Sequence, residues 1–126
     1  MPASLDIKIL IVDDFATMRR IIKNILKQLG FNNIDEADDG VSALAKIQAS
    51  KFDLIVTDWN MPNMSGLDLL KAIRANENTK AVPVLMVTAE AMKDNIVEAV
   101  KSGVTNYVVK PFTAEVMKEK LDAIFK

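Results

Sequence analysis

The stretch FDLIVTD, Phe52 to Asp58, decides the fold class of this chain. Its middle, Leu54 to Val56, is a short apolar run, which is typical of a strand buried on both faces of a parallel sheet. The run ends in a carboxylate, Asp58, and the residues after it, WNMPNMSG, form a predicted loop. The stretch therefore predicts a central strand that carries a charged group at its carboxyl end.

Four further strands are predicted on either side of this one. They cover Lys8–Asp13, Asn33–Ala37, Val82–Thr88 and Asn106–Lys110. The second of them is short and polar, which favours a position at the edge of the sheet. Pro83 stands at the beginning of its strand, where proline is tolerated.

Helical spacing of apolar residues follows each strand. The predicted apolar faces are Met18, Ile22, Ile25 and Leu29; Val41, Leu44 and Ile47; Leu67, Leu70 and Ile73; Met92, Ile96, Ala99 and Val100; and Met117, Leu121 and Ile124. Gly30 and Gly103 are predicted to end the first and fourth helices. Thr113 is predicted to cap the last helix.

Five strands that alternate with five helices predict an α/β fold. Such alternation implies right-handed crossovers and a doubly wound five-stranded parallel sheet, of the flavodoxin-like order 2-1-3-4-5. The 126 residues fit one domain, 1–126. A (β/α) barrel is excluded because it requires about 250 residues.

The composition excludes several classes of function. With 16 basic and 17 acidic side chains, the chain offers no electrostatic reason to bind nucleic acid or a membrane. It contains no Cys and no His, so disulfides, thiolate metal sites and Ser-His or Cys-His catalysis are excluded. The N-terminus has no secretory signal, so a cytoplasmic protein is expected.

Polar residues stand at the carboxyl ends of four predicted strands: Asp13 with Asp14, Asp58, Thr88 and Lys110. Each alone has an ordinary explanation, such as helix capping or solvation. In a doubly wound sheet, however, these ends converge on one crevice where ligands bind. Clustered carboxylates repel one another unless a cation neutralises them, and oxygen ligands that retain water suit Mg²⁺. Lysine and a hydroxyl beside the metal would cradle a phosphoryl group, with Asp58 as nucleophile.

A second class of function remains open at this point. The fold order also suits a flavin- or nucleotide-binding protein, but the loop after the first strand is DDFATM, whose acidic pair would repel a phosphate without a metal. The chain has neither a GxxxxGK[ST] loop nor a GxGxxG motif, so a nucleotide site of those kinds is not predicted.

The segments ILIVDDF, EADDG, DWNMPNMSG, PVLMVTAEA and YVVKPFTAE resemble the receiver domains of two-component response regulators, and within them the stand-alone chemotaxis regulators. The resemblance implies that Asp58 accepts a phosphoryl group from the phospho-His of a histidine kinase. It implies that Asp14, Asp58 and the backbone carbonyl of Asn60 bind Mg²⁺ directly and that Asp13 binds it through water. Thr88 and Lys110 would contact the phosphoryl group, and the Lys110–Pro111 bond would be cis.

The resemblance also implies a switch and a partner surface. Tyr107 matches the switch aromatic, and Asn60 and Glu90 match the pair that tunes self-dephosphorylation. The surface predicted to bind a flagellar motor switch protein comprises Ala91, Lys93, Tyr107, Val109, Phe112, Thr113 and Lys120; Phe112 could equally lie in the core. Met92 stands where a basic residue is more usual.

The function expected from this resemblance is that of a monomeric signalling switch rather than a metabolic enzyme. The expected partners are a histidine kinase of the chemotaxis type, the motor switch and an auxiliary phosphatase. A phosphate sink or relay receiver that does not bind the motor is the alternative.

Overall fold

The computed structural model describes residues 4–89 and 93–125. All five strands are parallel and lie in the order β2-β1-β3-β4-β5, as the sequence predicts. Their bounds are β1 Ile9–Val12, β2 Ile34–Ala37, β3 Leu54–Asp58, β4 Val84–Thr88 and β5 Asn106–Val109. The polar strand β2 lies at one edge, and β3 is central.

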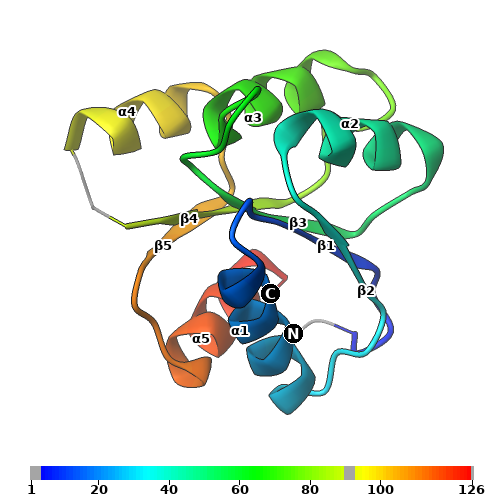
Figure 1. The fold of residues 1–126 in the computed structure, drawn as a ribbon, viewed down its shortest axis with the longest axis vertical. Helices are drawn as coiled ribbons and strands as arrows, with labels where there is room; N and C mark the ends of the chain where they lie inside the picture. The colour runs from blue at the N-terminus through cyan, green and yellow to red at the C-terminus, as the bar shows by residue number, and fades with distance from the viewer. Residues whose placement is uncertain (1–3, 90–92, 126) are drawn as a thin grey trace.

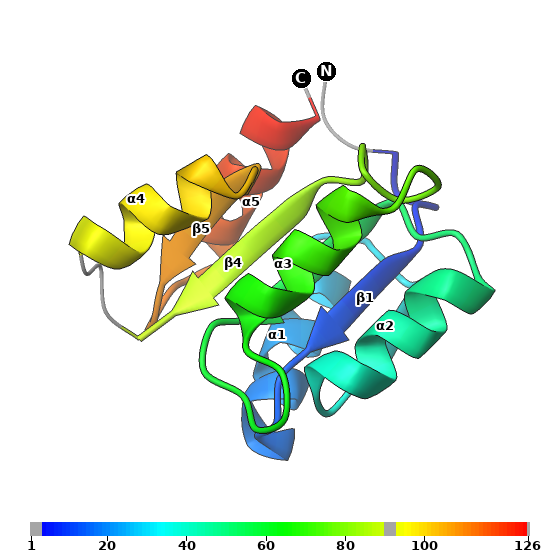
Figure 2. The same cartoon turned by 90° about the horizontal axis from the view of Figure 1, so that it is seen from above.

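Five helices cover the two faces of the sheet (Figure 1). One face carries α1 (Ala16–Gln28) and α5 (Ala114–Ile124), and the other carries α2 (Gly40–Ala49), α3 (Gly66–Ala75) and α4 (Lys93–Lys101). The arrowheads of β1 and β4 point to the same edge in Figure 2. We call this edge, where the strands end, the carboxyl edge, and the opposite one the amino edge.

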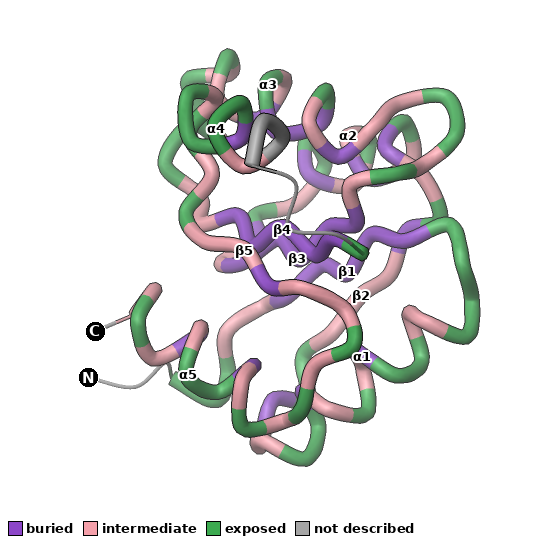
Figure 3. Tube along the Cα trace, turned by 90° about the vertical axis from the view of Figure 1, so that its left-hand side faces the viewer, coloured by how far each residue is buried: buried purple, intermediate pink, exposed green. Residues whose placement is uncertain are grey.

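Each face of the sheet has its own apolar core. Successive side chains of a strand point to opposite faces, so Ile9 and Ile11 pack against α1 and α5, whereas Leu10 and Val12 pack against α2 and α3. Burial is concentrated in the sheet layer between the helices (Figure 3). The unbroken apolar runs of β1, β3 and β4 follow from this burial on both faces.

The predicted helix ends are confirmed. Gly30 and Gly103 adopt φ values of 102° and 93°, which a side chain disfavours and glycine accepts. The Thr113 hydroxyl accepts a hydrogen bond from the Val116 N–H at 3.2 Å and caps α5. Within the described residues, no helix is both long and apolar enough to cross a membrane.

Each strand is one or two residues shorter than predicted, and two helix faces also differ from the prediction. The strand β4 begins at Val84, so Pro83 precedes it. Val41 is 55% exposed, and the buried face of α2 consists of Gly40, Ala43 and Ile47, because small residues let this helix approach the neighbouring loop. Val100 is likewise exposed, whereas Ala99 is buried.

Candidate functional site

The parallel sheet brings the predicted polar residues to its carboxyl edge. Asp58 and Thr88 are the last residues of the neighbouring strands β3 and β4, and Asp13 and Lys110 directly follow β1 and β5. Asp58 is 7% exposed and Thr88 is 8% exposed. The rigid strands therefore hold these polar groups at the rim of the core rather than in solvent.

Three carboxylates converge at this edge. One oxygen from each of Asp13, Asp14 and Asp58 lies within 4.8 Å of the others. Asp13 is almost fully buried, whereas Asp14 is exposed and leaves one side of the cluster open. This donor set, all oxygen with an open side for water, fits Mg²⁺.

Lys110, which follows the edge strand β5, reaches into the cluster. Its Nζ lies 3.1 Å from Asp58 Oδ1 and 3.5 Å from Asp13 Oδ2. The Lys110–Pro111 peptide bond is cis, as predicted. One ammonium group thus faces two largely buried carboxylates.

The environment of Asp58 changes its acidity. Burial raises the pKa of this carboxyl above its usual value. The hydrogen bond from Lys110 works in the opposite direction, and the charge of Asp13 adds to the increase. The rise therefore reflects a carboxylate that is incompletely compensated by the protein itself.

Arg19 fixes the position of Asp13, a contact that the sequence did not predict. Its Nη1 donates to the Asp13 backbone carbonyl at 2.6 Å, and its Nε pairs with Glu36 of β2 at 3.2 Å. Asp13 Oδ1 also accepts a hydrogen bond from the Phe15 N–H at 2.8 Å. These contacts leave Asp13 Oδ2 directed toward Lys110.

Gly66 is a second residue whose role sequence reasoning missed. A Cβ at this position would lie 2.1 Å from the carbonyl oxygen of Asp58, so only glycine permits α3 to start this close to β3. The Gly66 N–H also donates to the Trp59 carbonyl at 2.8 Å and closes the loop. A glycine that follows a Ser N-cap in the sequence SG was the available signal.

The predicted switch and surface residues lie around β5 and α5. Tyr107 is half-buried, and Lys120 Nζ lies 5.2 Å from the centre of its ring. Phe112 is partly buried and packs against the core on the α1 and α5 face. Val109 is half-buried and Thr113 is exposed.

The remaining predicted residues belong to the loop after β3, to the start of α4 or to the part of the chain that the structure does not describe. Asn60 is exposed in the loop after β3. Lys93 is the first residue of α4. Glu90, Ala91 and Met92 lie outside the described residues.

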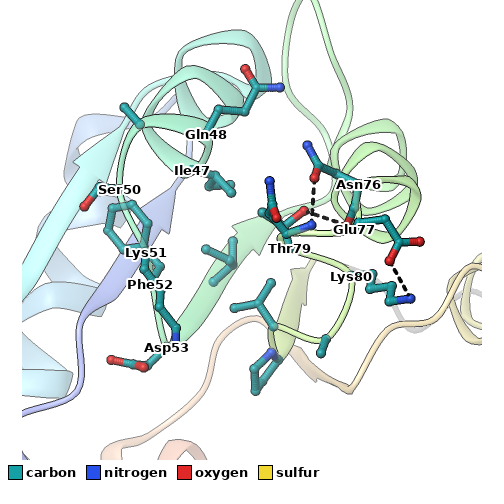
Figure 4. A pocket seen from close by; sticks show the side chains of 16 residues that line it. Ile47, Gln48, Ser50, Lys51, Phe52, Asp53, Asn76, Glu77, Thr79 and Lys80 are labelled. Atoms are coloured by element: carbon teal, nitrogen blue, oxygen red, sulfur yellow. Dashed lines mark hydrogen bonds and ion pairs between the residues drawn. The ribbon is translucent and has the colours of Figure 1, made fainter.

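An open pocket of about 890 Å³ lies at the amino edge, far from the acidic cluster. Figure 4 shows its walls, with Phe52 and Asp53 before β3 on one side and Asn76 and Lys80 of the loop before β4 on the other. Lys80 already pairs with Glu77 at 2.9 Å. Among the residues that the structure describes, no predicted site residue lines this pocket.

Comparison with known proteins identifies the family of this chain. Residues 9–122 match the response regulator receiver domain family, and the chain belongs to that family. The Chemotaxis protein CheY of Pseudomonas aeruginosa is 64% identical over 119 residues, which cover 94% of this chain and 96% of that protein. The chain is thus a chemotaxis-type receiver of the two-component response regulators, which sets aside the flavin alternative.

Solved structures show the same fold. Vibrio cholerae CheY4 superposes with a TM-score of 0.88 at 36% identity, covering 94% of this chain and 98% of that one. The receiver domain of a Pseudomonas aeruginosa sensor histidine kinase, solved with a magnesium ion coordinated in its active-site cleft, gives a TM-score of 0.84 at 27% identity. That alignment covers 96% of this chain and 99% of that chain.

Proposed function

We propose that this protein is a signalling switch that accepts a phosphoryl group on Asp58 from the phospho-His of a histidine kinase. The observation that carries the proposal is the convergence of three carboxylate oxygens within 4.8 Å, with Lys110 Nζ at 3.1 Å from Asp58. Structural residues have no reason to gather so much like charge at one edge, whereas a metal-dependent phosphoryl site requires it.

The transfer itself is a displacement at phosphorus. An Asp58 carboxylate oxygen attacks the phosphorus, the P–N bond to imidazole breaks, and the bonding electrons leave with the imidazole. The product is an acyl phosphate on Asp58. Mg²⁺, when bound, would neutralise charge on the phosphoryl oxygens.

The chain's own residues would hold the reacting groups in place. Asp14, Asp58 and the Asn60 carbonyl would ligate Mg²⁺ directly, and Asp13 would act through water. Lys110 would turn its ammonium from Asp58 to a phosphoryl oxygen, and the Thr88 hydroxyl would donate to another. Asn60 and Glu90 would set the rate at which the acyl phosphate is hydrolysed, and an auxiliary phosphatase would accelerate it.

The output would pass through Tyr107 to the surface formed by α4, β5 and α5. Movement of Thr88 toward the phosphoryl group would give the half-buried ring of Tyr107 space to turn inward. The partner surface would comprise Ala91, Lys93, Tyr107, Val109, Phe112, Thr113 and Lys120, and its partner would be a flagellar motor switch protein. The chemotaxis relatives support this choice of partner.

Phosphoryl uptake tests the nucleophile. The protein is incubated with acetyl phosphate and Mg²⁺, and incorporation is followed by mass spectrometry. Asp58→Asn should abolish uptake, whereas Asp53→Asn, the same change at the amino edge, should leave it intact. Uptake by Asp58→Asn at the wild-type rate would show that another residue is the nucleophile.

Binding to a motor switch peptide tests the output. The protein is compared with and without an acyl-phosphate mimic of beryllium and fluoride. Tighter binding of the mimic-loaded form is expected. Equal binding in both states would favour a phosphate sink or relay receiver.

A further inference from the structure

The loop between β3 and α3, residues 59–65, is closed at its base and also held at its tip. At the base, the Gly66 N–H donates to the Trp59 carbonyl at 2.8 Å. The tip is Asn63, whose side chain forms a hydrogen bond with Asp39, the N-cap residue of α2. The two residues are 24 positions apart in the sequence. Figure 2 shows the loop at the carboxyl edge. The loop carries Asn60, whose carbonyl is a ligand in the proposed function.

Asn63 combines an unusual backbone with a specific side-chain contact. Its φ is 69°, and it is the only non-glycine residue with a positive φ in the part of the chain that the structure describes. Glycine would adopt this conformation with less strain. The asparagine side chain instead donates from Nδ2 to Asp39 Oδ2 at 3.2 Å.

Asp39 uses both of its carboxylate oxygens. Oδ1 accepts a hydrogen bond from the Ser42 N–H at 2.7 Å and caps α2, while Oδ2 accepts from Asn63. A helix cap needs only one acceptor, which serine provides equally well. The second oxygen is therefore available to hold the loop.

A backbone contact lies directly beside this hydrogen bond. A Cβ on Gly40 would stand 2.7 Å from Met64 Cβ and 2.8 Å from the Met64 carbonyl oxygen. The start of α2 and the loop tip thus touch at two consecutive residues of each segment. The side-chain hydrogen bond and the close packing therefore both hold the loop tip against the start of α2.

We propose that Asp39 and Asn63 are positioning residues for magnesium binding. Their hydrogen bond holds the loop tip against α2 and so fixes the backbone around Asn60, which lies three residues before Asn63. A loop that is ordered in advance does not lose that freedom when the ion binds, and affinity rises accordingly. This inference rests on the proposed function, because it assigns these residues to its metal site.

Magnesium titration tests the proposal, with the fluorescence of Trp59, next to Asp58, as the reporter. Asn63→Gly keeps the left-handed backbone and removes the bond, and Asp39→Ser keeps the cap and removes the second oxygen. Each should weaken Mg²⁺ binding by about fivefold, the range of one hydrogen bond. The double variant should bind no more weakly than either single one, because both remove the same interaction.

A reversed pair provides the rescue. Asn63→Asp alone places two carboxylates against each other and should weaken binding. Adding Asp39→Asn restores a hydrogen bond with the opposite polarity, since asparagine still caps α2 and aspartate tolerates the left-handed backbone. Both proteins carry the new charge at residue 63, so a gain of Mg²⁺ affinity in the double variant reports the bond rather than the charge.

The control is Asn76→Gly, the same change in a turn at the amino edge, which should leave Mg²⁺ affinity at the wild-type value. Wild-type affinity in both Asn63→Gly and Asp39→Ser would overturn the positioning role and leave the proposed function intact. Independent, multiplying effects in the double variant would overturn it as well. A wild-type protein that does not bind Mg²⁺ would overturn the metal site and this inference together.

Discussion

The amino edge and the carboxyl edge of the sheet accommodate charge in opposite ways. At the amino edge, the Asp53 carboxylate accepts a hydrogen bond from the Lys8 N–H at 2.8 Å. Arg74 of α3 donates to the carbonyl oxygens of Val82 and Gly103 at 2.6 and 2.9 Å. At the carboxyl edge, three carboxylates lie close together, and the ammonium of Lys110 pairs with two of them, Asp13 and Asp58.

This difference indicates that the carboxyl edge lowers the stability of the fold, whereas the amino edge raises it. Charges at the amino edge satisfy backbone groups and tie loops together, which stabilises the fold. Like charges at the carboxyl edge repel one another and are partly desolvated, which is unfavourable without a ligand. Substitutions that remove a charge should therefore have opposite effects on stability at the two edges.

The largest effect is expected from Gly66→Ala, which tests how tightly the backbone of the carboxyl edge is packed. The added Cβ would meet the Asp58 carbonyl at 2.1 Å, so α3 must shift, at a cost of about 3–5 kcal/mol. Urea unfolding measures this cost. The neighbouring Ser65→Ala, which loses the α3 cap, should cost only about 1 kcal/mol, and equal values for the two would contradict the contact.

Arg74→Ala should give the next largest loss and tests the amino edge. The guanidinium also donates to the Thr105 hydroxyl at 3.3 Å and so joins the loops that precede β4 and β5. Removing it should destabilise the protein by about 2 kcal/mol, since several carbonyls lose a charged donor. Arg20→Ala, at an exposed position of α1, is the matched control and should change unfolding by at most about 0.5 kcal/mol.

Much of the carboxyl edge could be predicted from the sequence. Parallel strands end at a shared edge, so Asp13, Asp58, Thr88 and Lys110 had to converge once the strand order was inferred from alternation. The geometry needed no knowledge of side-chain packing. The apolar face of α2 could not be predicted in this way. Helical spacing favoured Val41, whereas the close approach of Met64 requires the small residue Gly40 on the buried face.

The contacts that hold the site were not predictable from sequence. Arg19 and Gly66 stand in locally ordinary helical sequences, and their roles depend on backbone groups that lie outside their own helices. The same holds at the amino edge for Arg74, which reaches a carbonyl 29 residues along the chain. Periodicity reports which side of a helix is buried but not which carbonyl a side chain will reach. Such tertiary contacts can be identified only in the folded structure.

Asp58→Asn should stabilise the metal-free protein. The change in unfolding free energy should be smaller than that of Arg74→Ala and opposite in sign. Burial raises the pKa of Asp58, so its ionised form is unfavourable in the folded state, and asparagine removes that charge. Mg²⁺ should then raise the melting temperature of the wild type and leave the variant unchanged. Asp53→Asn at the amino edge should not stabilise, and a gain there equal to that of Asp58→Asn would erase the contrast between the edges.

The smallest effect is the pH dependence of that stabilisation. Because the pKa of Asp58 is raised from 3.8 in the folded state, the folded protein holds this proton more tightly than the unfolded chain does. The contribution of Asp58 to stability is therefore most favourable below pH 3.8 and falls as the pH rises through the raised pKa. The stability difference between Asp58→Asn and wild type, measured by urea unfolding without metal, should accordingly be largest at neutral pH and shrink on acidification.

The pKa of Asp35 in β2 is shifted in the opposite direction to that of Asp58. Burial raises the pKa of its carboxyl, but the Glu36 N–H and the ammonium of Lys46, at 3.0 Å, outweigh it and leave the pKa below 3.8. Its contribution is present above pH 3.8 and is lost as the pH falls through the lowered pKa. The loss of unfolding free energy in Asp35→Asn should therefore become smaller on acidification. The gain of unfolding free energy in Asp58→Asn also becomes smaller on acidification. If the gain of stability in Asp58→Asn instead became larger toward acid pH, Lys110 rather than burial would determine the pKa of Asp58.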